Sequence, residues 1–251
     1  MCRNALVTTP CQTWFWPEHR VRPGGNLLLF GFVVGPNRSP GSLGFRNLGW
    51  TAQLISNPDE EPPRWKVRKL ETPANPWRVL VGAAVLVQDG QVYLFGADEP
   101  RHDVFLLRVA AEAREGRLGA IERWCGGRRG WLPQSKIESP PEPVFLEGQT
   151  EFSVHRDSAS GRYLQVQTVG YGATDISMRT AVRLQGPWIP LRKLYRPPES
   201  DAPDAFVYAG KAHPELRGAD LILTCANGKD SRVATDMSIY FPRFVRVPMG
   251  R

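Results

Sequence analysis

One structural unit occurs four times along this chain: a strand, a tight turn, a second strand, a loop and a third strand. The second strands are the clearest members, each an apolar run, and they cover residues 26–30, 91–95, 162–166 and 220–224. Turn signals precede them, for example Asp89-Gly90 and Ser160-Gly161. A unit that returns roughly every 60 residues is typical of a repeat architecture.

The segments around these second strands complete the repeat. First strands are predicted at 83–87, 152–155 and 208–213, third strands at 50–55, 104–109, 176–184 and 237–247, and outer fourth strands at 65–70, 121–124 and 188–194. The pattern predicts an all-β protein, a β-propeller of about four visible blades in a single domain over residues 1–251. A β-sandwich is the main alternative, but a sandwich would not require the same unit four times.

Charge and hydropathy limit the partners. The net charge is +7, yet there is no long basic run, so a solvated basic surface is favoured over nucleic-acid binding. No apolar span of about 18 residues exists, which excludes a membrane helix. The first 16 residues lack the apolar core of a signal peptide. As written, the chain is predicted to be cytoplasmic; a start further upstream would make it secreted or cell-envelope.

Motifs for cofactor or metal chemistry are missing. The four cysteines form no C-x-x-C pair, and the four histidines, His19, His102, His155 and His213, have no metal-ligand spacing. The sequence also contains no phosphate-binding loop, no G-x-S-x-G and no H-E-x-x-H. No cofactor and no metal are therefore expected.

Six segments, in this order, carry a family resemblance: Trp14-Phe15-Trp16-Pro17, residues 89–96, Met178-Arg179-Thr180-Ala181, Gly186-Pro187-Trp188, residues 211–216 and residues 240–247. Together they resemble domain-of-unknown-function family 4185. The resemblance implies a five-bladed propeller related to furanosidase-type glycoside hydrolases such as family 43, some of whose relatives degrade arabinan-type polysaccharides. Four units are visible here where the family has five. We therefore expect an N-terminally incomplete domain that lacks the first blade and the catalytic carboxylate it would carry.

Two carboxylates are candidates for catalysis, because glycoside hydrolysis uses one carboxyl group as acid and another to activate water or attack carbon. The innermost strands of a propeller line a central funnel, so polar residues at their heads are the candidates. Glu151 heads the strand at 150–154 and is predicted to be the general acid; the alternative is an exposed loop position. Asp175 precedes the strand at 176–184 and is either the second carboxylate or a turn residue.

Three further residues are predicted to contact substrate in the second half of the chain. Lys211 and His213 open the last innermost strand, where His213 could bind sugar hydroxyls or orient a carboxylate, or bond a neighbouring backbone group instead. Arg179 could clamp a substrate, although an ion pair with Asp175 is the simpler expectation.

The first half of the chain offers Trp16, Glu18 and His19. Glu18 and His19 are placed at the funnel mouth or in a surface loop. Trp16 could stack on a sugar ring, although packing between blades is the commoner role of Trp.

The functional prediction is a glycoside hydrolase-like propeller whose partner is a carbohydrate polymer, for example an arabinan or another furanose-rich glycan. A non-catalytic carbohydrate-binding propeller and a protein-interaction propeller are the alternatives.

Overall fold

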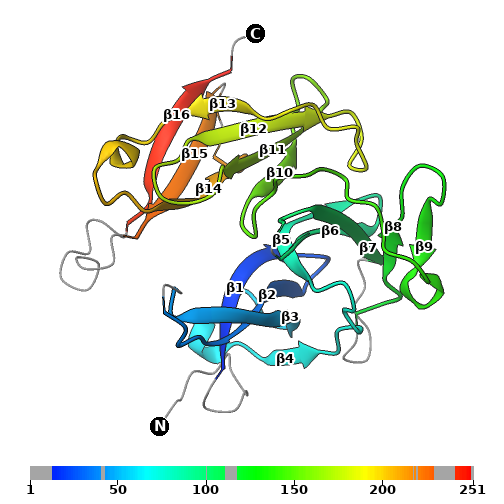
Figure 1. Ribbon diagram of the computed structural model, residues 1–251. Helices are drawn as coiled ribbons and strands as arrows, with labels where there is room; N and C mark the ends of the chain where they lie inside the picture. The colour runs from blue at the N-terminus through cyan, green and yellow to red at the C-terminus, as the bar shows by residue number, and fades with distance from the viewer. Residues whose placement is uncertain are drawn as a thin grey trace. The chain divides into compact units, whose positions relative to one another are not determined.

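The computed structural model describes residues 13–40, 43–99, 101–110, 118–216, 218, 220–228 and 241–249 of the 251 residues. Over these residues the regular structure is strand and short 3-10 helix, without an α-helix. The chain divides into two compact units, Met1–Pro143 and Val144–Arg251, which we describe in turn (Figure 1).

Unit 1 contains two antiparallel sheets. The strands of the first are β1 (Trp14–Val21), β2 (Leu27–Pro36), β3 (Phe45–Ile55) and β4 (Val67–Leu70). The strands of the second are β5 (Val79–Gln88), β6 (Gln91–Asp98), β7 (Val104–Ala110), β8 (Glu122–Trp124) and β9 (Trp131–Pro133). In both sheets the spatial order of the strands follows their order in the sequence.

Unit 2 repeats this plan. The strands of its first sheet are β10 (Ser153–Arg156), β11 (Tyr163–Thr168), β12 (Ile176–Ala181) and β13 (Arg192–Tyr195). The strands of its second sheet are β14 (Val207–Ala212), β15 (Asp220–Asn227) and β16 (Arg243–Pro248). The described residues also form three 3-10 helices in the connections between strands. Two lie in unit 1, at Pro62–Arg64 and Gln134–Lys136, and one lies in unit 2, at Pro198–Asp201.

The four sheets are successive meanders, which are the blades of a β-propeller. The prediction of an all-β propeller is confirmed, and the second strand of every predicted unit coincides with β2, β6, β11 or β15. Tight turns such as Asp89-Gly90 between β5 and β6 connect paired strands, because both of these residues adopt positive φ angles of 50° and 70°.

Each unit has an apolar core shared by its two blades. In unit 1, Phe30 and Leu28 of β2 pack with Val79 and Val81 of β5. In unit 2, Val166 of β11 belongs to a cluster with Met178, Ala212 and Leu223. Burying a side chain of this size contributes about 1.5–3 kcal/mol, so the shared cores hold neighbouring blades together within each unit.

Several strand limits differ from the sequence prediction. β1 was not expected as a strand, because Pro17 and the polar run after it interrupt the apolar pattern. Proline is tolerated in β1 because this strand pairs with β2 alone and lies at an edge of its sheet. The strand expected at 176–184 ends at Ala181, and β16 begins only at Arg243; residues 237–240 of that prediction lie outside the described residues.

Candidate functional site

Three of the four innermost strands contain an irregularity in their pairing. The pairing register shifts between Pro17 and Arg20 in β1, between Val81 and Ala84 in β5, and between Tyr208 and Lys211 in β14. Such a β-bulge places extra residues outside the ladder and redirects their side chains, and bulges are common next to active sites.

Acidic residues lie at or near the innermost strand in two blades. Glu18 and His19 are the bulge residues of β1, with paired residues on both sides. In the third blade the ladder of β10 begins at Ser153 and is regular, and Glu151 lies two residues before it.

Glu151 lies beside Lys211 in unit 2. Burial raises the pKa of the Glu151 carboxyl, and the nearby positive charge of Lys211 lowers it by a smaller amount. A hydrogen bond of 2.8 Å from the backbone N of Ala212 to Ser153 Oγ fixes β14 against β10 close to this pair. A carboxyl group with a raised pKa retains its proton closer to neutral pH, which is the property that a general acid needs.

The loop that leads into Glu151 is anchored by buried polar side chains. The Arg179 guanidinium donates to the carbonyl oxygens of Leu146 (3.0 Å) and Glu147 (3.3 Å), and Gln167 Nε2 donates to the Glu147 carbonyl (2.9 Å). Arg179 also lies over the Phe145 ring at 4.4 Å from its centroid. Burial lowers the pKa of Arg179 to about 10, although the charge of Glu147 opposes this shift.

Through these contacts Arg179 binds the backbone of the loop that leads into Glu151. The expected ion pair with Asp175 is not formed, because Asp175 binds other cations and Arg179 binds backbone carbonyls. With only 5% of its surface exposed, Arg179 acts as a positioning residue for the Glu151 loop. Its expected contact with substrate stays a prediction.

A partly exposed aromatic cluster lies at the same edge of the third blade as Glu151. The ring centroids of Tyr171 and Phe206 are 5.4 Å apart, and those of Phe206 and Tyr208 are 5.7 Å apart. Tyr171 follows the end of β11, and β11 ends opposite the start of β10. With 63% of its surface exposed, Tyr171 offers a ring to solvent. Aromatic rings and a few convergent polar groups are typical of small-ligand sites.

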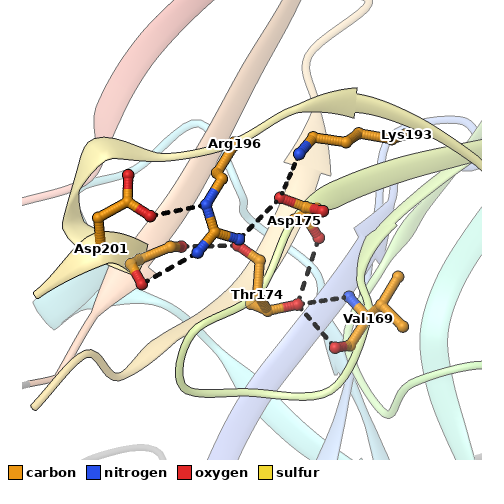
Figure 2. A network of polar contacts seen from close by, with 7 residues as sticks. Val169, Thr174, Asp175, Lys193, Arg196 and Asp201 are labelled. Carbon is orange, nitrogen blue, oxygen red and sulfur yellow. Dashed lines mark hydrogen bonds and ion pairs between the residues drawn. The ribbon is translucent and has the colours of Figure 1, made fainter. Parts of the chain in front are cut away.

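Asp175 belongs to the polar network shown in Figure 2. Its Oδ1 atom lies 3.0 Å from Lys193 Nζ and 3.1 Å from Arg196 Nη1. Arg196 also binds Asp201 at 2.8 Å, and Thr174 Oγ1 donates to the Val169 carbonyl at 2.6 Å. The network links the segment around Tyr171 to β13 and the 3-10 helix after it.

The electrostatics of Asp175 follow from these contacts. Its partial burial favours the neutral carboxyl, but hydrogen bonds and charges from Lys193 and Arg196 outweigh this and lower the pKa. Asp175 is therefore ionised at neutral pH and held by partners from the outer part of the blade, whereas Glu151 precedes the innermost strand. Its catalytic assignment stays a prediction, and the contacts favour a bracing role.

The sequence had suggested that His213 and Lys211 open the last innermost strand. In the structure Lys211 is the next-to-last residue of β14, and His213 follows the end of this strand. The His213 ring bonds on both sides, with Nδ1 2.9 Å from Glu215 Oε1 and Nε2 2.7 Å from Thr224 Oγ1. The partners of His213 are thus side chains and not the backbone group that the alternative named, and its contact with substrate stays a prediction.

Trp16 contributes to packing in unit 1. Its ring lies 4.9 Å from that of Phe45 and packs against the shared core. Glu18 and His19 are half-buried at the β1 bulge, and a β-carbon added at Gly82 of β5 would lie 3.8 Å from Glu18 Cβ. The inner strands β1 and β5 therefore approach each other at Glu18.

Sequence reasoning missed the polar residues Gln165 and Gln167 on β11. Both are fully buried, and Gln165 Nε2 donates to Gln167 Oε1 at 2.8 Å. Two glutamines alternating inside an otherwise apolar strand are the signal that could have identified a buried polar layer.

Two features are absent from the described residues. No three His, Cys, Asp or Glu side chains in this part of the chain gather as they would around a metal ion. Nor do the described residues include a helix with the length and apolar character that crossing a membrane requires.

The four meander sheets define the chain as a β-propeller protein, and the candidate site of unit 2 lies where Glu151 precedes β10, beside Lys211 of β14. It belongs to the family described as "Domain of unknown function (DUF4185)", which matches residues 53–235. The family expected from the ordered motifs is thereby confirmed. No curated protein sequence matches the chain.

Solved structures are similar to this chain to different degrees. A protein named "putative hydrolase" from Bacteroides ovatus is similar over 94% of this chain and 61% of its own, with a TM-score of 0.69 and 17% identity. This chain therefore spans less than two thirds of that protein. Two further structures are more distant. One is an α-L-arabinofuranosidase from Podospora anserina, which is similar over 96% of this chain and 92% of its own, with a TM-score of 0.45 and 11% identity. The other is a GH43 β-xylosidase/α-arabinofuranosidase from a compost metagenome, which is similar over 93% of this chain and 91% of its own, with a TM-score of 0.43 and 10% identity.

Proposed function

We propose that this protein is a glycoside hydrolase-type propeller that acts on a polysaccharide, with Glu151 as the general acid. The observation that carries the proposal is the placement of Glu151: a carboxyl whose pKa is raised by burial, ahead of an innermost strand and beside Lys211. The resemblance between this family and furanosidase-type hydrolases makes arabinan, or another furanose-rich glycan, the first substrate to test.

In the proposed reaction the Glu151 carboxylic acid gives its proton to the glycosidic oxygen as the bond between that oxygen and the anomeric carbon breaks. A second carboxylate either takes a proton from the attacking water or attacks the anomeric carbon itself. Lys211 favours the ionised form of Glu151 that remains after proton transfer, because its positive charge lies nearby.

Asp175 is the candidate for the second carboxylate within unit 2. It is ionised, as a base or nucleophile must be, but it is already held by Lys193 and Arg196. These ion pairs support a structural role for Asp175.

The test is the rate of reducing-sugar release from arabinan by the wild-type chain and by carboxylate-to-amide variants. Glu151→Gln should keep the fold and reduce kcat by about 100-fold or more, the low end of general acid catalysis. Glu147→Gln is the matched control, because Glu147 is an exposed residue of the same loop. An unchanged rate in Glu151→Gln would remove this residue from the role.

Asp175→Asn then tests the candidate for the second carboxylate. If Asp175 acts on water or carbon, its loss in kcat should be comparable with that of Glu151→Gln, whereas a bracing residue should mainly raise KM or lower the stability.

A non-catalytic carbohydrate-binding function is the second candidate. The exposed Tyr171 and its partners Phe206 and Tyr208 favour it, because an aromatic platform binds sugars without a carboxyl pair. Binding to a glycan array together with an absence of sugar release from every polysaccharide would select this function.

A further inference from the structure

A cavity of about 170 Å³ lies within unit 1, apart from the bulge residues Glu18 and His19. Its walls come from β3, from the segment that connects the first blade to the second, and from the start of the turn after β6. Pockets for drug-sized ligands are commonly about 300 Å³ or larger, so this cavity suits one small ligand or a single sugar residue.

The connecting segment that forms one wall is fixed on both sides. The Asn75 side chain brackets Val79, donating to its carbonyl oxygen at 2.8 Å and accepting from its backbone N at 3.1 Å. Gln134 Nε2 donates to the Ala74 carbonyl, and the Arg123 guanidinium lies over the Trp77 ring at 5.3 Å. A wall held in this way needs little ordering when a ligand binds, which favours affinity.

Arg78 lines the cavity in an unusual backbone conformation. Its φ angle is 52°, in the left-handed region that a residue with a β-carbon adopts at a cost of roughly 1–2 kcal/mol. Backbone strain of this kind is concentrated at functional sites. The side chain is exposed, and among the described residues no carboxylate forms an ion pair with it.

Glu99 supplies the opposite chemistry in the same cavity. Asn47 Nδ2 donates to Glu99 Oε1 at 2.8 Å, which orients the carboxylate. The residues that line the cavity therefore include a guanidinium donor and a carboxylate acceptor, together with Trp50, a buried aromatic residue.

This combination selects the charge of the ligand. A hydroxyl group both donates and accepts, so a neutral polyhydroxylated molecule can satisfy Arg78 and Glu99 together. A carboxylated ligand would be attracted by Arg78 but repelled by Glu99, and a cationic ligand would be attracted by Glu99 but repelled by Arg78, so the two residues together give neither charge a net advantage.

We propose that this cavity is an accessory subsite that binds one neutral sugar residue, with Arg78 and Glu99 as its polar contacts. The choice of a sugar as the ligand rests on the proposed function. The site itself is independent of Glu151, which belongs to unit 2.

The test uses full-length, isotope-labelled protein carrying Glu151→Gln, so that no ligand is consumed, and records amide NMR spectra. The probes are arabinotriose, xylotriose and, as the charged comparison, trigalacturonate. We expect a neutral trisaccharide to shift the amide signals of Leu48 and Gly49, which line the cavity. Arg78→Ala should weaken this binding at least tenfold.

Two further variants serve as controls, one for folding and one for the loss of an arginine outside the cavity. Arg78→Gly removes the same side chain but adopts the positive φ angle freely, so it keeps the fold if Arg78→Ala does not. Arg68→Ala is the matched control, since Arg68 is an exposed residue of β4 outside the cavity, and it should bind as the parent does.

The outcomes also separate this proposal from the proposed function. Shifts at Leu48 and Gly49 would support the subsite even if the wild-type chain hydrolyses no polysaccharide. Unshifted amides with both neutral probes, binding of trigalacturonate alone, or equal binding by the Arg78 and Arg68 variants would overturn it, even if hydrolysis at Glu151 is found.

Discussion

Gly210→Ala is expected to separate the two blades of unit 2 at the candidate site. Gly210 is one of the bulge residues of β14, and a β-carbon added there would lie 2.8 Å from the backbone N of Thr168 and 3.0 Å from its Cγ2 atom. Ordinary van der Waals contacts begin at 3.4 Å, so β14 must move away from the end of β11 by about half an ångström.

The magnitude follows from two opposing effects. Overpacking of this kind costs about 1–3 kcal/mol of unfolding free energy. Replacing glycine by alanine also restricts the unfolded chain and recovers about 0.4–1 kcal/mol. The net loss is about 1–2 kcal/mol, which corresponds to a fall in Tm of roughly 2–8 °C for a protein of this size.

The assay is thermal unfolding followed by circular dichroism, with Gly25→Ala as the control. A β-carbon at Gly25 would meet nothing within 4 Å, so this variant should be neutral or slightly stabilised. Because Lys211 directly follows Gly210, the rate of glycan hydrolysis should fall as well. Equal Tm values for Gly210→Ala and Gly25→Ala would refute the close packing of β14 against β11.

Three further predictions concern the groups around the site. Burial raises the folded-state pKa of Glu151, so its stabilising contribution is complete below the unfolded pKa and is lost as pH rises through the folded pKa. The glutamine in Glu151→Gln cannot ionise, so this variant should not lose stability in the same way. The unfolding free energy of Glu151→Gln minus that of the wild type, measured in urea, should therefore increase from pH 4 to pH 8; a difference independent of pH would contradict the burial. Tyr171→Ala should weaken oligosaccharide binding at least fivefold in calorimetry, whereas Phe241→Ala, which removes another exposed aromatic ring, should not. Arg196→Ala removes a brace of the segment around Tyr171 and should speed amide hydrogen exchange in that segment while leaving the exchange rates within β11 unchanged; unchanged exchange around Tyr171 would show that the network in Figure 2 does not hold this segment.

The repeat was predictable because blade strands have short apolar runs bounded by Gly-rich turns. All four second strands lie where the pattern indicated. Glu151 was expected within a strand at 150–154, but β10 begins only at Ser153, so Glu151 precedes the strand. β1 was missed because its polar bulge residues Glu18 and His19 replace the alternation that identifies a strand.

The partners of the candidate residues could not be predicted. The bulge in β14 alters its register with β15, so the place of Lys211 beside Glu151 depends on an irregularity that no periodicity reveals. Tyr171 and Phe206 are far apart in the sequence and meet because Gly172 pairs with Val207 through two backbone hydrogen bonds.

The most direct test of the account is a crystal structure of the Glu151→Gln variant with a bound arabinan oligosaccharide. The account predicts a glycosidic oxygen within about 2.6–3.2 Å of the side chain at position 151, the reach of a general acid. It also predicts a sugar ring against Tyr171. An oligosaccharide bound elsewhere, with no contact to position 151 or to Tyr171, would contradict the assignment of this site.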